Sequence, residues 1–224
     1  FVGLEVLSIT SYILVGMRKK SVQSNEGAFK YIVMGGISSA LILYGMSFLY
    51  GMSGTTNITE INDALIANYS SFHALIYVSF FLMLAGFGFK IAAAPFHTWA
   101  PDVYQGAPTP IAAFLAVVSK AAGFAILFRL LYNVFFGVGD PETMPIHTDV
   151  FLAVSVLAAA AMIAGNLLAL RQTNMKRLLA YSGIANAGYL LVPLAIAFSP
   201  LHYNNFSELI YYLAAYLFMN FGAF

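Results

Sequence analysis

Long stretches without a charged side chain recur along the whole chain. Each of the longer stretches approaches the roughly 20 residues that a helix needs to cross the hydrocarbon core of a bilayer. Their apolar residues are continuous rather than alternating with polar ones, which favours helices over a membrane β-barrel. Only 8% of the residues are charged, against about a quarter in an ordinary soluble domain. The stretches are Ile32–Tyr50, Ala74–Phe89, Ile111–Ser119, Ala121–Phe128, Val150–Leu170, Leu178–Phe198 and Leu209–Phe224. We therefore predict an all-α polytopic membrane protein.

The apolar segments divide the chain into about seven expected transmembrane helices. They cover about residues 1–17, 29–50, 71–93, 109–134, 149–170, 176–198 and 206–224. The chain opens inside an apolar segment, without an initiator Met or a signal-peptide pattern, so we expect it to be the middle of a longer protein. It contains no cysteine, which excludes disulfides and thiolate sites for metals or clusters.

Basic residues in the loops predict the orientation in the membrane. Lys and Arg close to transmembrane helices remain on the cytoplasmic side. They occur in the first and fifth loops and are absent from the even-numbered loops. The residues are Arg18, Lys19, Lys20, Lys30, Arg171, Lys176 and Arg177. We therefore expect loops 18–30, 97–109 and 171–177 to be cytoplasmic, in an energy-transducing membrane such as the bacterial inner membrane.

Three charged residues are expected well inside the bilayer. Lys120 lies ten residues after Pro110, where a helix is expected to begin, so it is roughly 15 Å deep. Glu5 precedes Arg18 by thirteen residues, or roughly 20 Å of helix. Lys90 follows a long uncharged run. Arg129, near the outer end of its helix, is expected to extend to the headgroups.

The segment around Lys90 is too long to cross the membrane as one straight helix. A helix over residues 71–105 would measure roughly 50 Å, against a core of roughly 30 Å. Gly86 and Gly88 weaken a helix, and Pro95 removes a backbone hydrogen bond and clashes with the preceding turn. We predict a helix broken near residues 91–95, with Lys90 beside the break and facing a cavity. Transporters use such broken helices to hold ions.

The chemistry of these residues suits proton transfer. A charge at the bilayer centre costs about 2.5 to 3.5 kcal/mol on insertion scales, so charges there are by default functional. Burial disfavours an ammonium ion and a nearby carboxylate restores it, so moving one partner switches proton affinity. We hypothesise a relay of Glu5, Lys90 and Lys120, although the sequence does not show that they are neighbours. The alternative is that Glu5 and Lys90 form a buried ion pair that only locks helix packing.

Polar residues also gather near the expected cytoplasmic ends of the helices. His97, Asp102 and Tyr104 are candidates for a proton entrance. For Trp99 and Tyr104 we favour the alternative that they are interfacial anchors at headgroup level; Asp102 could instead tie the loop. The remaining histidines, His73, His147 and His202, are expected at the surface. No histidine pair has metal-ligand spacing, and there is no nucleotide fingerprint. Segments 35–45 and 158–166 are rich in small residues that permit close helix packing.

The same segments resemble a known family. They are FKIAAAPFHTWAPDVYQGAPTPIAAFLAVVSKAAG (89–123), GLEVLSITSYILVG (3–16), SNEGAFKYIVMGGISSALILYGMSFLYG (24–51) and ALRQTNMKRLLAYSGIANAGY (169–189). Together they look like the N subunit of proton-pumping NADH:quinone oxidoreductase, respiratory complex I, an antiporter-like protein. The pattern WxPDVYxGAPTP over residues 99–110 is specific for the N type.

The resemblance implies a fold of about fourteen helices with two inverted repeats, each with a broken helix. The chain would be a single membrane-domain fragment, residues 1–224, with most of the first repeat in 1–134 and the start of the second in 149–224. Glu5, Lys90 and Lys120 match the family's essential glutamate and two of its lysines. No cofactor is expected in this chain; NADH, FMN, Fe–S clusters and quinone would belong to other subunits. Expected partners are other membrane subunits of complex I, including a neighbouring antiporter-like subunit, and the lipid bilayer, with no nucleic acid.

The resemblance implies a non-redox subunit of a translocase that moves protons while quinone is reduced elsewhere in the complex. Two alternatives remain. One is a cation/proton antiporter subunit or a membrane-bound hydrogenase subunit of the same superfamily. The other is a structural membrane subunit that does not pump, although the buried charges speak against it.

Overall fold

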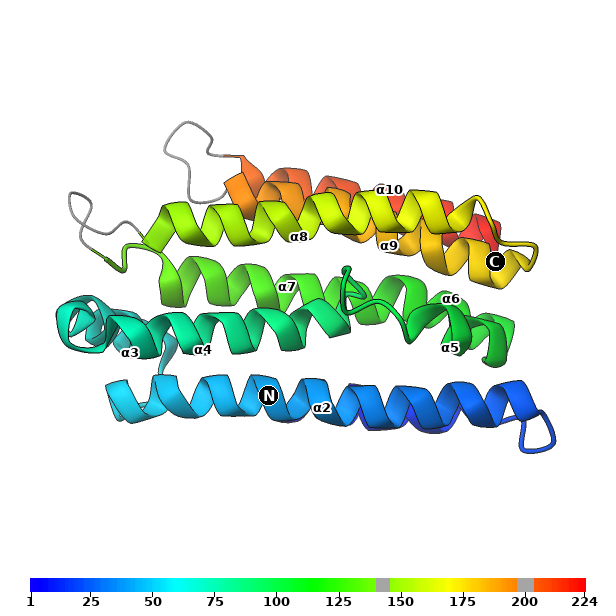
Figure 1. Cartoon of the computed structure of the whole chain (residues 1–224), viewed down its shortest axis with the longest axis horizontal. Helices are drawn as coiled ribbons and strands as arrows, with labels where there is room; N and C mark the ends of the chain where they lie inside the picture. Colours follow the sequence, from blue (N-terminus) through cyan, green and yellow to red (C-terminus); the bar gives the residue numbers. More distant parts are fainter. Residues whose placement is uncertain (140–145, 197–203) are drawn as a thin grey trace.

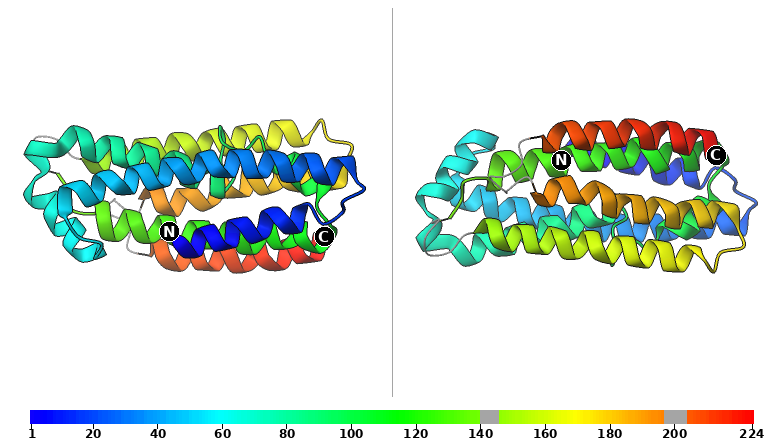
Figure 2. Two further views of the ribbon diagram at one scale, coloured as in Figure 1. Left: turned by 90° about the horizontal axis from the view of Figure 1, so that it is seen from below. Right: turned by 90° about the horizontal axis from the view of Figure 1, so that it is seen from above.

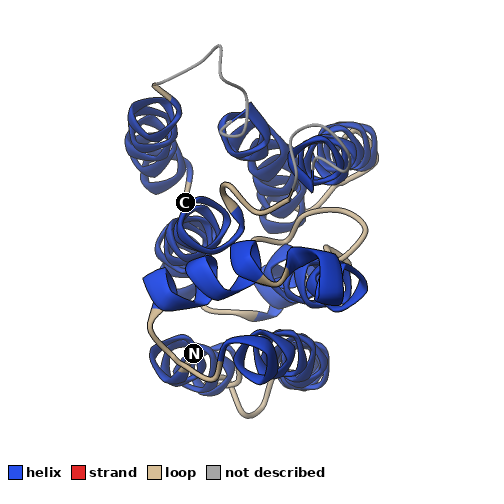
Figure 3. Ribbon diagram, turned by 90° about the vertical axis from the view of Figure 1, so that its left-hand side faces the viewer, coloured by secondary structure: helices blue, strands red, loops and turns tan. Residues whose placement is uncertain are grey.

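The chain forms an elongated bundle of helices that run along its long axis (Figure 1). The computed structural model describes residues 1–139, 146–196 and 204–224. These residues form helices and loops, with no strand among them (Figure 3). Five spans in this part of the chain are long and apolar enough to cross a membrane. They are α2 (Val22–Ser53), α4 (Tyr69–Lys90), the composite helix Thr109–Phe135, α8 (Ile146–Ala169) and α9 (Met175–Ile196). The prediction of an all-α polytopic membrane protein is confirmed.

Two further helices occupy the first and last expected spans. α1 (Val2–Val15) is apolar but has 14 residues, fewer than the roughly 20 of a complete span. α10 (Asn205–Ala223) has 19 residues. Both run along the long helices of the bundle (Figure 2), so each of the seven expected segments contains a helix in the described part of the chain.

α3 (Ile58–Ala67) was not expected from the sequence. It begins after Asn57, whose side chain accepts a hydrogen bond from the Thr59 amide at 3.1 Å. Its Asn62 side chain donates to the backbone carbonyls of Val134 and Phe136, both at 2.8 Å. These two bonds fasten α3 to the end of the composite helix.

The expected break follows α4, and it lies near mid-length of the bundle (Figure 1). The helix ends at Lys90, and the chain becomes helical again only in α5 (Ala100–Gly106). Ala92 adopts a φ of 57°, a left-handed conformation that costs a residue with a Cβ roughly 1–2 kcal/mol. The prediction of a break near residues 91–95 is confirmed, and the interruption extends as far as Trp99.

The composite helix contains two π-helical turns that periodicity did not reveal. It consists of α6 (Thr109–Phe114), η1 (Leu115–Ser119), α7 (Lys120–Leu130) and η2 (Leu131–Phe135). η1 ends immediately before Lys120. Because π-turns inside α-helices are frequent at functional sites, the position of η1 draws attention to Lys120.

Candidate functional site

Glu5 and Lys90 meet inside the bundle. The Lys90 ammonium nitrogen lies 3.6 Å from Glu5 Oε1, and the two side chains are 7% and 21% exposed respectively. Lys90 comes from the last turn of α4 and Glu5 from the first part of α1. The sequence indicated each charge separately, and the fold brings them together as an ion pair.

Two serines complete this pair. Lys90 Nζ donates to Ser8 Oγ at 2.7 Å, and Ser39 Oγ donates to Glu5 Oε1 at 2.7 Å. Sequence reasoning missed both residues. Ser8 was detectable, because it lies three residues after Glu5 and therefore on the same helix face. Ser39 lies in the small-residue segment 35–45, which we had assigned to packing alone.

The broken helix creates a favourable place for the Lys90 cation. Carbonyl groups at the end of a helix carry partial negative charge, which stabilises a nearby cation. Some of the carbonyl groups at the end of α4 accept hydrogen bonds from residues of the break itself. The Ala93 amide donates to the Gly88 carbonyl at 2.8 Å, and the Trp99 indole donates to the Phe89 carbonyl at 3.2 Å. The break is thus held rigidly while Lys90 points to Glu5 and Ser8.

Lys120 lies in a different environment from Lys90. It is 2% exposed, and its ammonium group donates to the Gly183 carbonyl of α9 at 2.6 Å. Among the described residues it forms no ion pair with a carboxylate. It lies close to the break all the same, since a methyl group at Gly123, one turn further along α7, would be 3.7 Å from Lys90 Cβ. The structure therefore pairs Glu5 with Lys90, whereas Lys120, one turn from the contact between Gly123 and the break, bonds to α9 instead.

Asp102 joins the three loops that we expect on one side of the membrane. Its carboxylate accepts from Lys30 at 2.6 Å and from Arg177, which also donates to Gln105 Oε1 at 3.1 Å. Lys176 adds a bond of 2.7 Å to the Ala107 carbonyl. Asp102 therefore ties α5 to α2 and α9, which agrees with the proposed tie of the loop; we call Asp102, Lys30 and Arg177 the clasp.

The clasp predicts a pH-dependent stability. Burial raises the pKa of the Asp102 carboxyl, but hydrogen bonds from Lys30 and Arg177 outweigh it and hold the pKa below its usual value. A carboxyl with a depressed pKa stabilises the fold above its unfolded pKa of about 3.9 and loses that contribution as the pH falls further. We expect Asp102→Asn to lower stability by about 1 to 2 kcal/mol at pH 7 and to match the wild type in strong acid.

Thermal unfolding of the complete subunit in detergent, followed across pH, measures this difference. Asp63→Asn is the matched control, because Asp63 is exposed on α3 and has no ion pair in the described part of the chain. Equal stability of Asp102→Asn and wild type at pH 7 would contradict the clasp.

The interpretation of Trp99 and Tyr104 as interfacial anchors is wrong. Trp99 is 4% exposed and Tyr104 is fully buried. The Trp99 ring stacks on Tyr31 with centroids 4.5 Å apart, inside the bundle rather than at the headgroups. The pattern of apolar and polar residues cannot distinguish a ring that faces lipid from one that faces another helix, because lipid and the facing helix are both apolar.

The entrance candidates separate into different environments. Asp102 belongs to the clasp. His97 is half-buried and its Nδ1 has no hydrogen-bond partner in the described part of the chain, as is true of the buried Tyr104 hydroxyl. Their role as an entrance stays a prediction. Of the other histidines, His73 is exposed as expected, whereas the His147 side chain and His202 lie outside the described residues.

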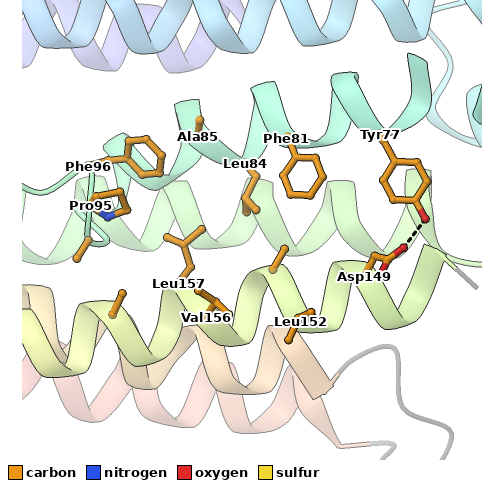
Figure 4. Close-up of a pocket in the computed structure, with 13 residues that line it drawn as sticks. Tyr77, Phe81, Leu84, Ala85, Pro95, Phe96, Asp149, Leu152, Val156 and Leu157 are labelled. Atoms are coloured by element: carbon orange, nitrogen blue, oxygen red, sulfur yellow. Dashed lines mark hydrogen bonds between the residues drawn. The ribbon is translucent and has the colours of Figure 1, made fainter. Parts of the chain in front are cut away.

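A cavity of about 560 Å³ lies between α4 and α8, beside the break (Figure 4). Pro95 and Phe96 line it at the break, and Leu84 and Leu157 line it further along. Its polar contact is a hydrogen bond of 2.6 Å from the Tyr77 hydroxyl to Asp149 (Figure 4). Neither Lys90 nor Lys120 lines it. Since proton transfer needs a chain of hydrogen-bonding groups, this apolar cavity is not the relay.

Metal ligands do not gather in this bundle. Within residues 1–139, 146–196 and 204–224 there is no group of three or more His, Cys, Asp or Glu placed to hold a metal ion.

A helix broken at mid-depth, with ionisable side chains buried beside the break, defines an antiporter-like membrane protein. The chain belongs to the NADH:quinone oxidoreductase/Mrp antiporter transmembrane family, whose model matches residues 1–224. This confirms the resemblance drawn from the sequence.

Relatives and solved structures agree with this family. The chain is 59% identical, over its full length, to NADH-quinone oxidoreductase subunit N of Paenibacillus sp. (strain JDR-2), and covers 43% of that relative. It is 35% identical to a chain of respiratory complex I from Thermus thermophilus, with a TM-score of 0.73, covering 98% of this chain and 44% of that one. A chain of the Mrp complex from Dietzia sp. DQ12-45-1b has a TM-score of 0.80 at 23% identity, with 98% and 38% covered, and supports the fold. The chain thus spans less than half the length of these relatives.

Proposed function

We propose that this chain is the proton-conducting part of an N-type subunit of NADH:quinone oxidoreductase. The observation that carries the proposal is the Glu5–Lys90 ion pair at the break, with a separation of 3.6 Å inside an apolar bundle. Buried ion pairs stabilise a fold poorly compared with apolar residues. A pair retained at this position is better explained by charge movement than by packing.

In this mechanism Glu5 sets the proton affinity of Lys90. While the carboxylate is 3.6 Å away, it favours the ammonium form. A shift of α1 that separates the pair leaves Lys90 in a medium that disfavours its charge, and Lys90 releases its proton. Lys120, beside the break, is the next acceptor, and from it the proton leaves toward the part of the protein outside this chain.

The chain would contribute no redox chemistry. NADH, FMN, Fe–S clusters and quinone would be held by other subunits of the complex, and quinone reduction there would drive the shift that separates Glu5 from Lys90. Neighbouring membrane subunits, one of them antiporter-like, are the proposed partners. The clasp would face the cytoplasm of a bacterial cell.

Neutralising the pair tests this function. In the complete complex, Glu5→Gln and Lys90→Met should each lower pumping per NADH oxidised by about tenfold, which is about 1.4 kcal/mol. The double variant should pump as many protons per NADH oxidised as the less active of the two single variants, because both changes remove the same interaction. Proton uptake into vesicles, measured together with quinone reduction, gives the ratio.

The matched control is Glu60→Gln. Glu60 is exposed on α3, where it accepts from Thr55 and Asn57, and pumping should be unchanged. Assembled Glu5→Gln and Lys90→Met complexes that pump at the wild-type ratio would show that the pair only locks helix packing.

A further inference from the structure

Tyr216 of α10 places a phenol beside Lys120. The side chain is 2% exposed, and its hydroxyl is buried without a hydrogen-bond partner in the described part of the chain. Leaving a buried hydroxyl unpaired costs about 1–3 kcal/mol. Such a group is therefore retained either because water binds there or because its function requires it.

Gly183 shows how close the two groups lie. A methyl group at this position would be 2.8 Å from Lys120 Nζ and 3.0 Å from the Tyr216 hydroxyl oxygen. Both polar atoms therefore lie against the same side of Gly183, where a residue without a side chain leaves room for them. The site joins three helices, because Lys120 is on α7, Gly183 on α9 and Tyr216 on α10.

The hydrogen-bonding capacities of the two groups match. An ammonium group has three donors, and the bond to the Gly183 carbonyl at 2.6 Å accounts for one. A phenol oxygen can accept a hydrogen bond from the ammonium, or from a water that the ammonium holds, while its own O–H donates elsewhere. A polar space with several such partners is where a buried water binds.

Tyr104 is a second buried phenol, near the clasp. Its hydroxyl is also buried and unpartnered among the described residues. Tyr104 belongs to α5, two residues after Asp102. The described part of the bundle therefore holds one such phenol on α10 beside Lys120 and another on α5 near the clasp.

We propose that Tyr216 is a positioning residue for Lys120, which directs the ammonium group toward the space at Gly183 and holds a water there for proton exchange. In that exchange the ammonium gives one proton to the water, leaving a neutral amine, and the water passes one proton on toward the part of the protein outside this chain. The inference rests on the proposed function, and it deepens that function by naming where Lys120 exchanges its proton.

Removing the hydroxyl tests the inference. In the complete complex, Tyr216→Phe should lower pumping per NADH oxidised by about tenfold, less than the roughly 10²–10⁴-fold that a proton-transfer group itself contributes, because Tyr216 acts through Lys120; the complex should still assemble. The alkaline limit of pumping should also move to lower pH, because the phenol oxygen no longer stabilises the protonated amine. The groups that the described part of the chain places around the Lys120 ammonium are Tyr216 on α10 and the Gly183 carbonyl on α9, with no paired carboxylate. If Tyr216 had a purely structural role, the Tyr216→Phe variant would keep the alkaline limit of pumping at the wild-type pH.

Gly183→Ala is an independent second variant. Its methyl group would occupy the shared space and push apart two flexible side-chain ends, so the helices need not move. We expect the same loss of pumping and the same shift of the pH profile. The matched controls are Gly36→Ala, where a methyl group meets nothing within 4 Å, and Tyr211→Phe on the same helix, where the side chain is 79% exposed. Both controls should pump normally.

The outcomes separate the two proposals. If Lys120→Met stops pumping while Tyr216→Phe and Gly183→Ala keep the wild-type ratio and pH profile, Tyr216 has no positioning role and the proposed function stands. If Lys120→Met pumps normally, the proposed function itself fails. Should Tyr216→Phe not assemble, Gly183→Ala decides the matter by the same two measurements.

Discussion

Replacing Lys120 with methionine should abolish proton pumping without harming the fold. Lys120 is 2% exposed and has no paired carboxylate in the described part of the chain. Its removal therefore leaves no orphaned buried charge; only the Gly183 carbonyl loses a hydrogen bond. Methionine is apolar and of similar length, and replacing buried charges by apolar residues is often neutral or stabilising by about 1–4 kcal/mol. Pumping per NADH oxidised should fall by about a hundredfold or more, as expected when a proton-transfer group is lost.

A variant that gains stability and loses transport would identify a residue retained for function at the expense of stability. The measurements are thermal unfolding of the detergent-solubilised complex and proton uptake into vesicles at a fixed rate of quinone reduction. Lys19→Met is the matched control, because Lys19 lies exposed in the first loop and should change neither quantity. A Lys120→Met complex that is destabilised by several kcal/mol would instead assign Lys120 a structural role.

The membrane spans and the break were predictable because both depend on local chemistry. An uncharged run of about 20 residues is a span whatever surrounds it, and Pro95 removes a backbone donor in any context. The depth of Lys120 in the membrane, which was counted along a helix, stays a prediction. The pairing of Glu5 with Lys90 was not predictable, because it depends on how α1 packs against the end of α4, and small-residue segments do not specify which helix they contact.

The buried phenols show a second limit of sequence reasoning. Tyr104 and Tyr216 lie in apolar surroundings that resemble lipid in composition, so their burial within the protein left no signal. Nothing in the sequence marks Tyr216 as a site residue, since a tyrosine in an apolar helix is ordinarily a packing residue. The η1 turn was equally hidden, because one additional residue in a helical turn changes no residue type.

The contact between α8 and α9 carries the last prediction, because it depends on glycines that leave no room for a methyl group. These helices run side by side (Figure 1). A methyl group at Gly165 would lie 2.8 Å from Ala185 Cα, and one at Gly188 would lie 2.7 Å from the Ala158 carbonyl oxygen. Both neighbours are backbone atoms, which cannot rotate away as the end of a side chain can. Gly165→Ala should therefore force the two helices apart and destabilise the subunit by about 1–3 kcal/mol or more.

Gly36→Ala is the matched control for Gly165→Ala, because the same substitution is expected to change stability in the opposite direction there. Within a membrane, apolar side chains gain little from leaving lipid, so helix association depends on close packing between small residues. At Gly36 no atom lies within 4 Å of the added methyl, and alanine favours a helix over glycine by about 1 kcal/mol. The same substitution should thus stabilise α2 and destabilise the α8–α9 contact. Denaturation of the complete subunit in detergent measures both, and a Gly165→Ala variant as stable as Gly36→Ala would mean that the two helices can separate to make room for the methyl group at no cost.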